Sequence, residues 1–167
     1  MGSFSCMQRT LEAFFSAAEL TTSVLAEPAV AACWEEPSVL PDMSTGALAG
    51  HLVGATLRTE STLDALLPPT PKLLTLAEFY GPNRVSSPGD LQDEFHIFIR
   101  RDGENRAAKG PQALGNSFRS LMERLHGRLP GEPADRVVPT LRVEGGVAGY
   151  FDLRQSTAGS SPTDSRV

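Results

Sequence analysis

Apolar residues recur at helical spacing along most of this 167-residue chain, and prolines divide that pattern into separate segments. Over residues 7–33, one helical face is shared by Leu11, Phe14, Phe15, Ala18 and Leu25. Pro28 is expected to kink or restart this first helix, because proline lacks the N–H donor and its ring clashes with the preceding turn. Strand-like alternation is sparse. The pattern therefore predicts a mainly helical fold, in which amphipathic helices bury their faces in a bundle.

Three further helices are expected after the proline-containing loop "WEEPSVLPD". The second begins near Ser44 or Thr45, both good N-cap residues, and runs to about Leu67, where "PPTP" ends it. A long crossover over 68–90 leads to a third helix over 90–109, with Asp90 as its N-cap. The fourth starts at Pro111 and extends over the segment "GPQALGNSFRSLMERLHGRL". The stretch "RVVPTLRVEGG" is β-like but short, so it predicts at most a hairpin arm.

The length fits one domain, but the end of the chain differs in composition. From Gln155 onward, "QSTAGSSPTDSRV" has no apolar residues except Ala158 and Val167. Such a segment cannot bury enough apolar surface to offset the entropy cost of ordering it. We therefore expect a helical domain over residues 1–154 and a disordered tail over 155–167.

Charge and composition exclude several classes of partner. The net charge of −5, with no basic cluster beyond the pair Arg100 and Arg101, argues against nucleic-acid binding. Nothing approaches the roughly 18 continuous apolar residues of a membrane span, and the N-terminus does not read as a signal peptide. Cys6 and Cys33 form no CxxC motif, which favours a reduced, cytoplasmic protein.

The stretch "MSTGALAGHLVG" places His51 inside the expected second helix. On a helical wheel of about 100° per residue, His51 lies roughly 75° from the centre of the apolar stripe. That stripe consists of Leu48, Leu52, Ala55, Thr59, Leu63 and Leu66. An imidazole on the shoulder of a buried face can reach a cavity between helices. The residues alone leave two readings open: His51 is a histidine at the edge of the core, or it is one ligand of a metal site.

The other two histidines carry weaker signals. Glu123 and His126 form a Glu-x-x-His spacing that bundle metal sites use, but Glu123 falls roughly 150° from the apolar stripe of its helix and should face water. His96 lies among apolar residues in "EFHIFIRR" with no helpful ligand partner, so we expect a core or boundary histidine. No nucleophile motif or nucleotide-binding motif is present. Trp34 is expected to pack over one end of the bundle.

Two stretches resemble a known family. The first is "WEEPSVLPDMSTGALAGHL", with Trp34, Pro37, Ser38, Pro41 and His51 followed by Leu52 in the family's order. The second is "ENRAAKGPQALGNSFRSLMERLHGRLPGEPADRVVPTLRV". Over about residues 10–154 the chain is similar to the metal-binding domain of mycothiol-dependent maleylpyruvate isomerase, of the DinB/YfiT-like superfamily common in actinobacteria.

The resemblance implies an all-α, DinB-like, up-and-down four-helix bundle that binds a divalent metal, zinc in most members. In the family one His on the second helix and a Glu-x-x-x-His pair on a later helix hold the metal, which leaves positions for water or a thiol such as mycothiol. His51 matches the first of these ligands. In an intact relative, the metal would lower the pKa of a bound thiol for isomerisation or thiol transfer.

The chain departs from the family after "TLRV". The segment "GYFDLR" looks like the start of the next helix, but the polar tail follows and no Glu-x-x-x-His appears, as if by truncation or frameshift. We therefore expect an incomplete last helix and a degenerate metal site, with zinc weakly bound or absent. The alternative is a non-enzymatic helical interaction module that has lost the site and associates through an exposed groove, for example as a homo-oligomer.

Overall fold

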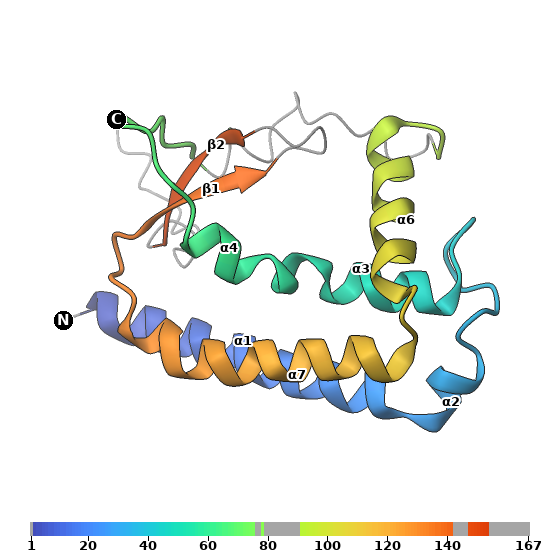
Figure 1. Cartoon of the computed structure of the whole chain (residues 1–167). Coiled ribbons are helices and arrows are strands. Elements are labelled where there is room, and N and C mark those ends of the chain that lie inside the picture. The colour runs from blue at the N-terminus through green and yellow to red at the C-terminus, as the bar shows by residue number, and fades with distance from the viewer. Residues whose placement is uncertain (1, 76–77, 79–90, 142–146, 154–167) are drawn as a thin grey trace, which may run out of the picture.

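Most of the described chain is helical in the computed structural model, which describes residues 2–75, 78, 91–141 and 147–153 (Figure 1). The helices are α1 (Gly2–Ala26), α2 (Pro28–Ala32), α3 (Thr45–Leu57), α4 (Thr59–Leu63), α6 (Glu94–Ala107), α7 (Pro111–Arg128) and the short 3-10 turn η1 (Leu129–Gly131). The strands are β1 (Val137–Leu141) and β2 (Val147–Asp152). The mainly helical, DinB-like bundle class is confirmed.

The helices form an open arrangement. Figure 1 shows α7 running antiparallel along α1, with α3 and α4 on the other side of α7. Helix α6 stands steeply on α3, and the strands lie beyond α4. Among the described residues, α7 is the one long helix that packs on both α1 and α3, so it lies at the centre of the molecule.

Local sequence sets the helix ends. Pro28 restarts the chain as α2 after a break at Glu27, as expected. The Ser44 hydroxyl accepts a hydrogen bond from the Ala47 amide at 2.9 Å, which confirms Ser44 as an N-cap. The predicted N-cap Asp90 is wrong for α6: that helix begins at Glu94, and the Asp93 carboxylate accepts from the Phe95 amide at 2.7 Å. Both residues are aspartates three positions apart, so propensity alone did not separate them.

The core lies chiefly between α1 and α7, and it follows the predicted apolar faces. Helix α1 contributes Phe15, Ala18 and Leu25, all buried. Helix α7 contributes Leu114, Phe118, Leu121, Met122 and Leu125. The helical period therefore identifies the two faces that meet in the middle of the molecule.

The predicted apolar stripe of the second helix is wrong except at Leu63, which is buried in the core. Leu52 is 54% exposed and Leu66 is 98% exposed, while the buried residues of α3 are the small ones: Gly46, Ala47, Ala49, Gly50, Val53 and Gly54. A Cβ on Gly50 would meet the Gly103 carbonyl of α6, and one on Gly103 would meet the Ala47 carbonyl. Helix α6 therefore approaches α3 at backbone contact, and this requires small residues where the wheel favoured leucines.

Helix α3 also ends earlier than predicted. It stops at Leu57, the short α4 follows to Leu63, and the chain is then extended toward residue 75. Of the predicted crossover over 68–90, residues 76–77 and 79–90 lie outside the described part. Within that part, Leu74 donates to the Tyr150 carbonyl at 2.8 Å, so this segment lies beside β2.

The strands form one antiparallel hairpin, as the β-like stretch suggested. Val138 pairs with Phe151 and Thr140 with Gly149. The expectation that "GYFDLR" begins a further helix is wrong, because β2 extends to Asp152. Its backbone groups are paired on one side with β1 and on the other with residues 72–74. The hydrogen-bonding groups of this segment therefore find their partners in an extended conformation and not in a helix. The tail predicted over 155–167 lies outside the described residues.

Trp34 closes the end of the bundle, as predicted. Its side chain is buried, and a Cβ on Gly46 would overlap the indole ring, so α3 begins directly against it. The indole Nε1 donates to the Ala107 carbonyl at 3.3 Å. Trp34 therefore links the start of α3 to the last turn of α6.

Candidate functional site

His51 lies on the exposed side of α3. The Ser44 cap fixes where α3 begins, and the contacts of Gly50 and Gly54 with α6 fix which side of the helix is buried. The histidine follows Gly50 directly, so it stands at the edge of that buried strip and its ring faces outward. The predicted position on the shoulder of a buried face, reaching a cavity between helices, is therefore not observed, and the assignment of His51 as a metal ligand stays a prediction.

A three-ligand metal centre is not formed by the described residues. No group of three or more His, Cys, Asp or Glu side chains that could hold a metal ion occurs among residues 2–75, 78, 91–141 and 147–153. Structural and catalytic zinc sites take three or four protein ligands. His51 therefore offers one imidazole, and the described part of the chain does not fit a complete zinc site around it.

A charged cluster lies two turns along α3 from His51. By helical geometry Arg58 is only about 20° around the helix from His51. Its guanidinium donates to the Asp102 carboxylate at 3.0 Å, and Arg106 donates to the same oxygen at 2.9 Å. Asp102 and Arg106 both come from α6, and both lie close to Gly54 of α3. The cluster therefore fastens α6 to α3 on the side next to His51.

The electrostatics of this cluster favour an ionised Asp102. Partial burial alone would raise the pKa of the Asp102 carboxyl, but the hydrogen bonds from Arg106 and Arg58 outweigh it and hold that pKa below its usual range. Two guanidinium groups share one carboxylate, so the cluster carries one net positive charge. The two guanidinium groups and the carboxylate satisfy one another's hydrogen bonds, so the main role of the cluster is to hold α6 against α3.

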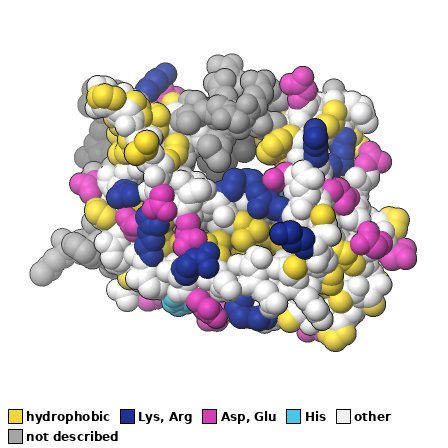
Figure 2. All heavy atoms as spheres, in the orientation of Figure 1, with side chains coloured by type: hydrophobic (Ala, Val, Ile, Leu, Met, Phe, Trp, Pro, Cys, Tyr) yellow, Lys and Arg dark blue, Asp and Glu magenta, His cyan; other side chains and the backbone are white. Residues whose placement is uncertain are grey.

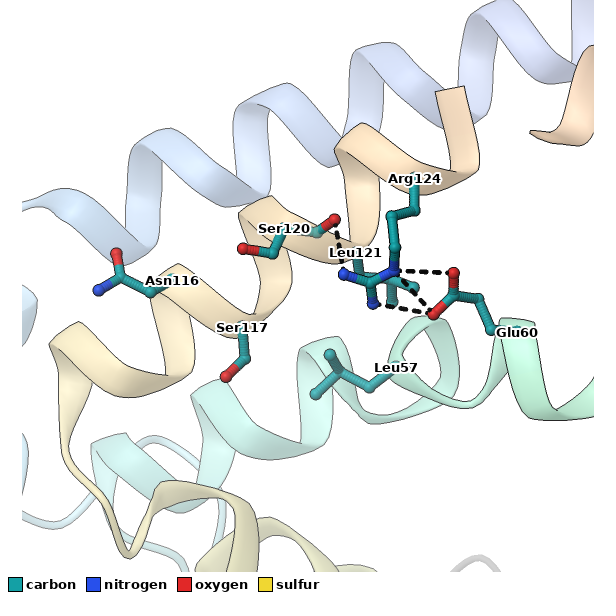
Figure 3. Close-up of a pocket in the computed structure, with 7 residues that line it drawn as sticks. All are labelled: Leu57, Glu60, Asn116, Ser117, Ser120, Leu121 and Arg124. Atoms are coloured by element: carbon teal, nitrogen blue, oxygen red, sulfur yellow. Dashed lines mark hydrogen bonds and ion pairs between the residues drawn. The ribbon is translucent and has the colours of Figure 1, made fainter. Parts of the chain in front are cut away.

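A hollow with a defined lining lies between α3–α4 and α7 (Figure 3). It is an open groove of about 460 Å³. Its floor is Leu57 and Leu121, and its α7 wall carries Asn116, Ser117 and Ser120. At one end the Arg124 guanidinium is held by both Glu60 oxygens, at 2.8 to 3.1 Å.

The groove has binding groups but no activated nucleophile. The Ser117 hydroxyl donates to the Ala113 carbonyl at 2.8 Å, within its own helix. Arg124 is occupied by Glu60, and that hydrogen bond lowers the pKa of the Glu60 carboxyl. No histidine lines the groove. The arrangement can accept a small polar molecule by hydrogen bonds, but the residues that line it include no general base beside the hydroxyls.

Paired charges continue beyond the groove. Arg128 bonds Asp64 of the α4 end and Glu132 after η1, each at 2.7 Å. Figure 2 shows basic and acidic side chains interleaved on this face of the molecule. Exposed pairs of this kind contribute little to stability one by one, but together they hold α4 against α7.

The other two histidines, His96 and His126, lie where the sequence predicted them. Glu123 and His126 are both exposed on α7, and the His126 ring stacks on Phe15 of α1 with centroids 3.7 Å apart. His96 is half-buried at a boundary beside Phe95. Cys33 is a free, exposed thiol. None of these residues joins His51 in a metal-binding group within the described part.

Sequence reasoning missed the Arg58–Asp102–Arg106 cluster. Asp102 and Arg106 are four residues apart, a spacing that places both on one helical face. That signal was available, but Arg58 lies 44 residues away from Asp102 in the chain, and only the crossing of α3 and α6 brings it there.

The comparison with protein families identifies the domain. The family model described as the mycothiol maleylpyruvate isomerase N-terminal domain matches residues 15–155. The chain belongs to this family. The match begins within α1 and extends past the end of β2, so the second half of α1, the later helices and the hairpin lie in the family domain. No curated protein and no solved structure matches the chain.

Membership in the family relates the chain to mycothiol maleylpyruvate isomerase, as the resemblance implied. Among the described residues, none of the helices has both the length and the apolar character needed to cross a membrane.

Proposed function

We propose that the chain is a thiol-isomerase-type helical domain in which His51 is a zinc ligand, and in which the metal site is incomplete. One observation carries the proposal: the His51 imidazole is exposed on α3, at the position that the family resemblance assigns to the first ligand. An exposed imidazole next to a rigid helix contact is free to bind a metal from solvent. One such ligand binds zinc weakly, because affinity depends on the number of ligands that act together.

On this proposal the described domain does not complete an isomerase centre on its own. Activation of mycothiol requires a metal that is held firmly enough to lower the pKa of the thiol. The described residues gather no three-ligand group for that purpose. We therefore assign the domain the role of a scaffold that keeps the family's first ligand. The reduced, cytoplasmic setting predicted from the two cysteines remains a prediction.

A competition titration against a chromophoric zinc indicator tests the proposal. We expect the wild-type chain to compete weakly for zinc, and His51→Ala to reduce that competition further. The matched control is His126→Ala, which removes another exposed histidine, on α7. Circular dichroism should show unchanged helix content in both variants.

Two results would count against the proposal. Zinc uptake that is the same in wild type and His51→Ala would remove His51 as the ligand. Tight binding of one zinc per chain would show a complete site, and would restore a catalytic metal centre as the leading function.

A further inference from the structure

The outward face of α1 carries a second apolar stripe that the bundle does not use. Ala13, Ala17, Leu20 and Val24 are all exposed, and Leu20 is 67% exposed. On a wheel of about 100° per residue they fall within roughly 60° of one another, about 150° from the face that packs on α7. A helix that is apolar on two opposite sides indicates a second packing partner.

Two charged residues extend this stripe at its ends. Arg9 lies one turn before Ala13, and Glu27 lies just beyond Val24, at the junction with α2. Both are exposed, and both fall within roughly 50° of the line through the apolar residues. In chain order the stripe therefore reads as a cation, two small residues, two larger residues and an anion.

The stripe is complementary to a second copy of itself that runs in the opposite direction. The pairs Ala17 with Leu20, Ala13 with Val24, and Arg9 with Glu27 are centred on nearly the same point of α1. An antiparallel copy of α1 would therefore place each small side chain against a larger one, and each charge against its opposite. A parallel copy would place Arg9 against Arg9 and leucine against leucine, and so lose both kinds of complementarity.

We propose that this outward face of α1, the stripe from Arg9 to Glu27, forms an antiparallel two-fold interface with a second copy of the chain. In such an isologous contact every pair occurs twice, so the two ends of the helix pair are closed by two Arg9–Glu27 ion pairs. The contact line is about 27 Å long at 1.5 Å per residue. Ala13 and Ala17 lie opposite Val24 and Leu20 of the second copy, and these small residues let the two helices approach closely.

The interface goes beyond the proposed function and does not depend on metal binding at His51. It lies on the side of α1 opposite α7, whereas α3 packs on the other side of α7. One helix pair is a small contact, so we expect a dissociation constant on the order of 10 µM.

Sedimentation velocity of the full chain tests the interface. We expect a reversible dimer, and we expect Leu20→Glu to raise the dissociation constant at least about 100-fold, because two carboxylates enter the apolar centre. The matched control is Leu66→Glu, the same change at a 98% exposed leucine outside α1, which should leave the dimer intact. Both leucines are exposed, and circular dichroism checks that each variant is folded.

A charge-reversal cycle tests the orientation. Arg9→Glu and Glu27→Arg should each weaken the dimer about 3- to 10-fold, and the double variant should restore it, because each reversed pair is again opposite in sign. A wild-type chain that stays monomeric up to about 100 µM would overturn the proposal. A dimer that is insensitive to Leu20→Glu would also overturn it. So would a double variant whose loss of dimerisation free energy equals the sum of the losses of the two single variants.

Discussion

Gly50 and Gly103 set the distance between α3 and α6. Because the two backbones touch at these residues, any side chain added there forces the helices apart. His51 stands beside this contact, and the Arg58–Asp102–Arg106 cluster closes it on one side. The position of the candidate ligand His51 thus depends on two glycines, which have no side-chain functional group.

Gly50→Ala should therefore destabilise the protein by about 1–3 kcal/mol, because the new methyl group meets the Gly103 carbonyl. Gly115→Ala is the matched control on α7, where a Cβ would meet nothing within 4 Å. There the change should be neutral or stabilising by about 0.5–1 kcal/mol, because alanine favours the helix. Urea unfolding followed by circular dichroism measures both. Equal effects of the two changes would contradict the close approach of α6 to α3.

The contribution of Asp102 to the stability of the protein should depend on pH. Its folded pKa is depressed, so its contribution is fully present above the unfolded value, near 3.8, and is lost as pH falls through the folded value. Asp102→Asn should therefore cost about 1–3 kcal/mol at pH 7, since it leaves two guanidinium groups facing a neutral amide. The cost should shrink as pH falls below about 4.

Urea unfolding of wild type and Asp102→Asn at pH 7 and pH 3 checks this. Glu123→Gln, at an exposed carboxylate of α7, is the control and should change stability little at either pH. A cost of Asp102→Asn that stays constant between the two pH values would contradict the ionised cluster.

Helix α3 begins at a cap that one residue provides. The Ser44 hydroxyl accepts from the Ala47 amide, and it also bonds the Glu104 carboxylate of α6 at 3.3 Å. Ser44→Ala should cost about 1 kcal/mol through the lost cap. Ser120→Ala, on an exposed part of α7, should cost nothing or stabilise slightly, because alanine is the better helix former. Chemical unfolding compares the two, and an equal loss at both serines would contradict the capping role.

The helices themselves were predictable from the sequence, because prolines, caps and the apolar period act locally. The buried side of α3 was not, since a wheel weights leucines over glycines, and only the approach of α6 makes Gly50 and Gly54 core residues. The strand β2 was missed for a similar reason. Its partners, Val138 and Leu74, come from different parts of the chain, and the local segment alone looked helical.

At the scale of the molecule, the described residues form a family domain built around α7, with α1 on one side and α3 carrying His51 on the other. Of the candidate site, the sequence named His51 and placed Trp34 at the bundle end. It did not name Arg58 and Asp102, which meet only in three dimensions. The outward stripe of α1 is present in the sequence as a second set of apolar residues at helical spacing. Only the structure shows that it is exposed, because the opposite face of α1 packs on α7.

Zinc retained through gel filtration, counted per chain by elemental analysis after the protein has been loaded with zinc, tests the incomplete site most directly. We expect well under one zinc per chain, because a single imidazole releases the metal as free zinc is removed. One zinc per chain after the column would contradict the proposal, since retention at that level requires several ligands that act together.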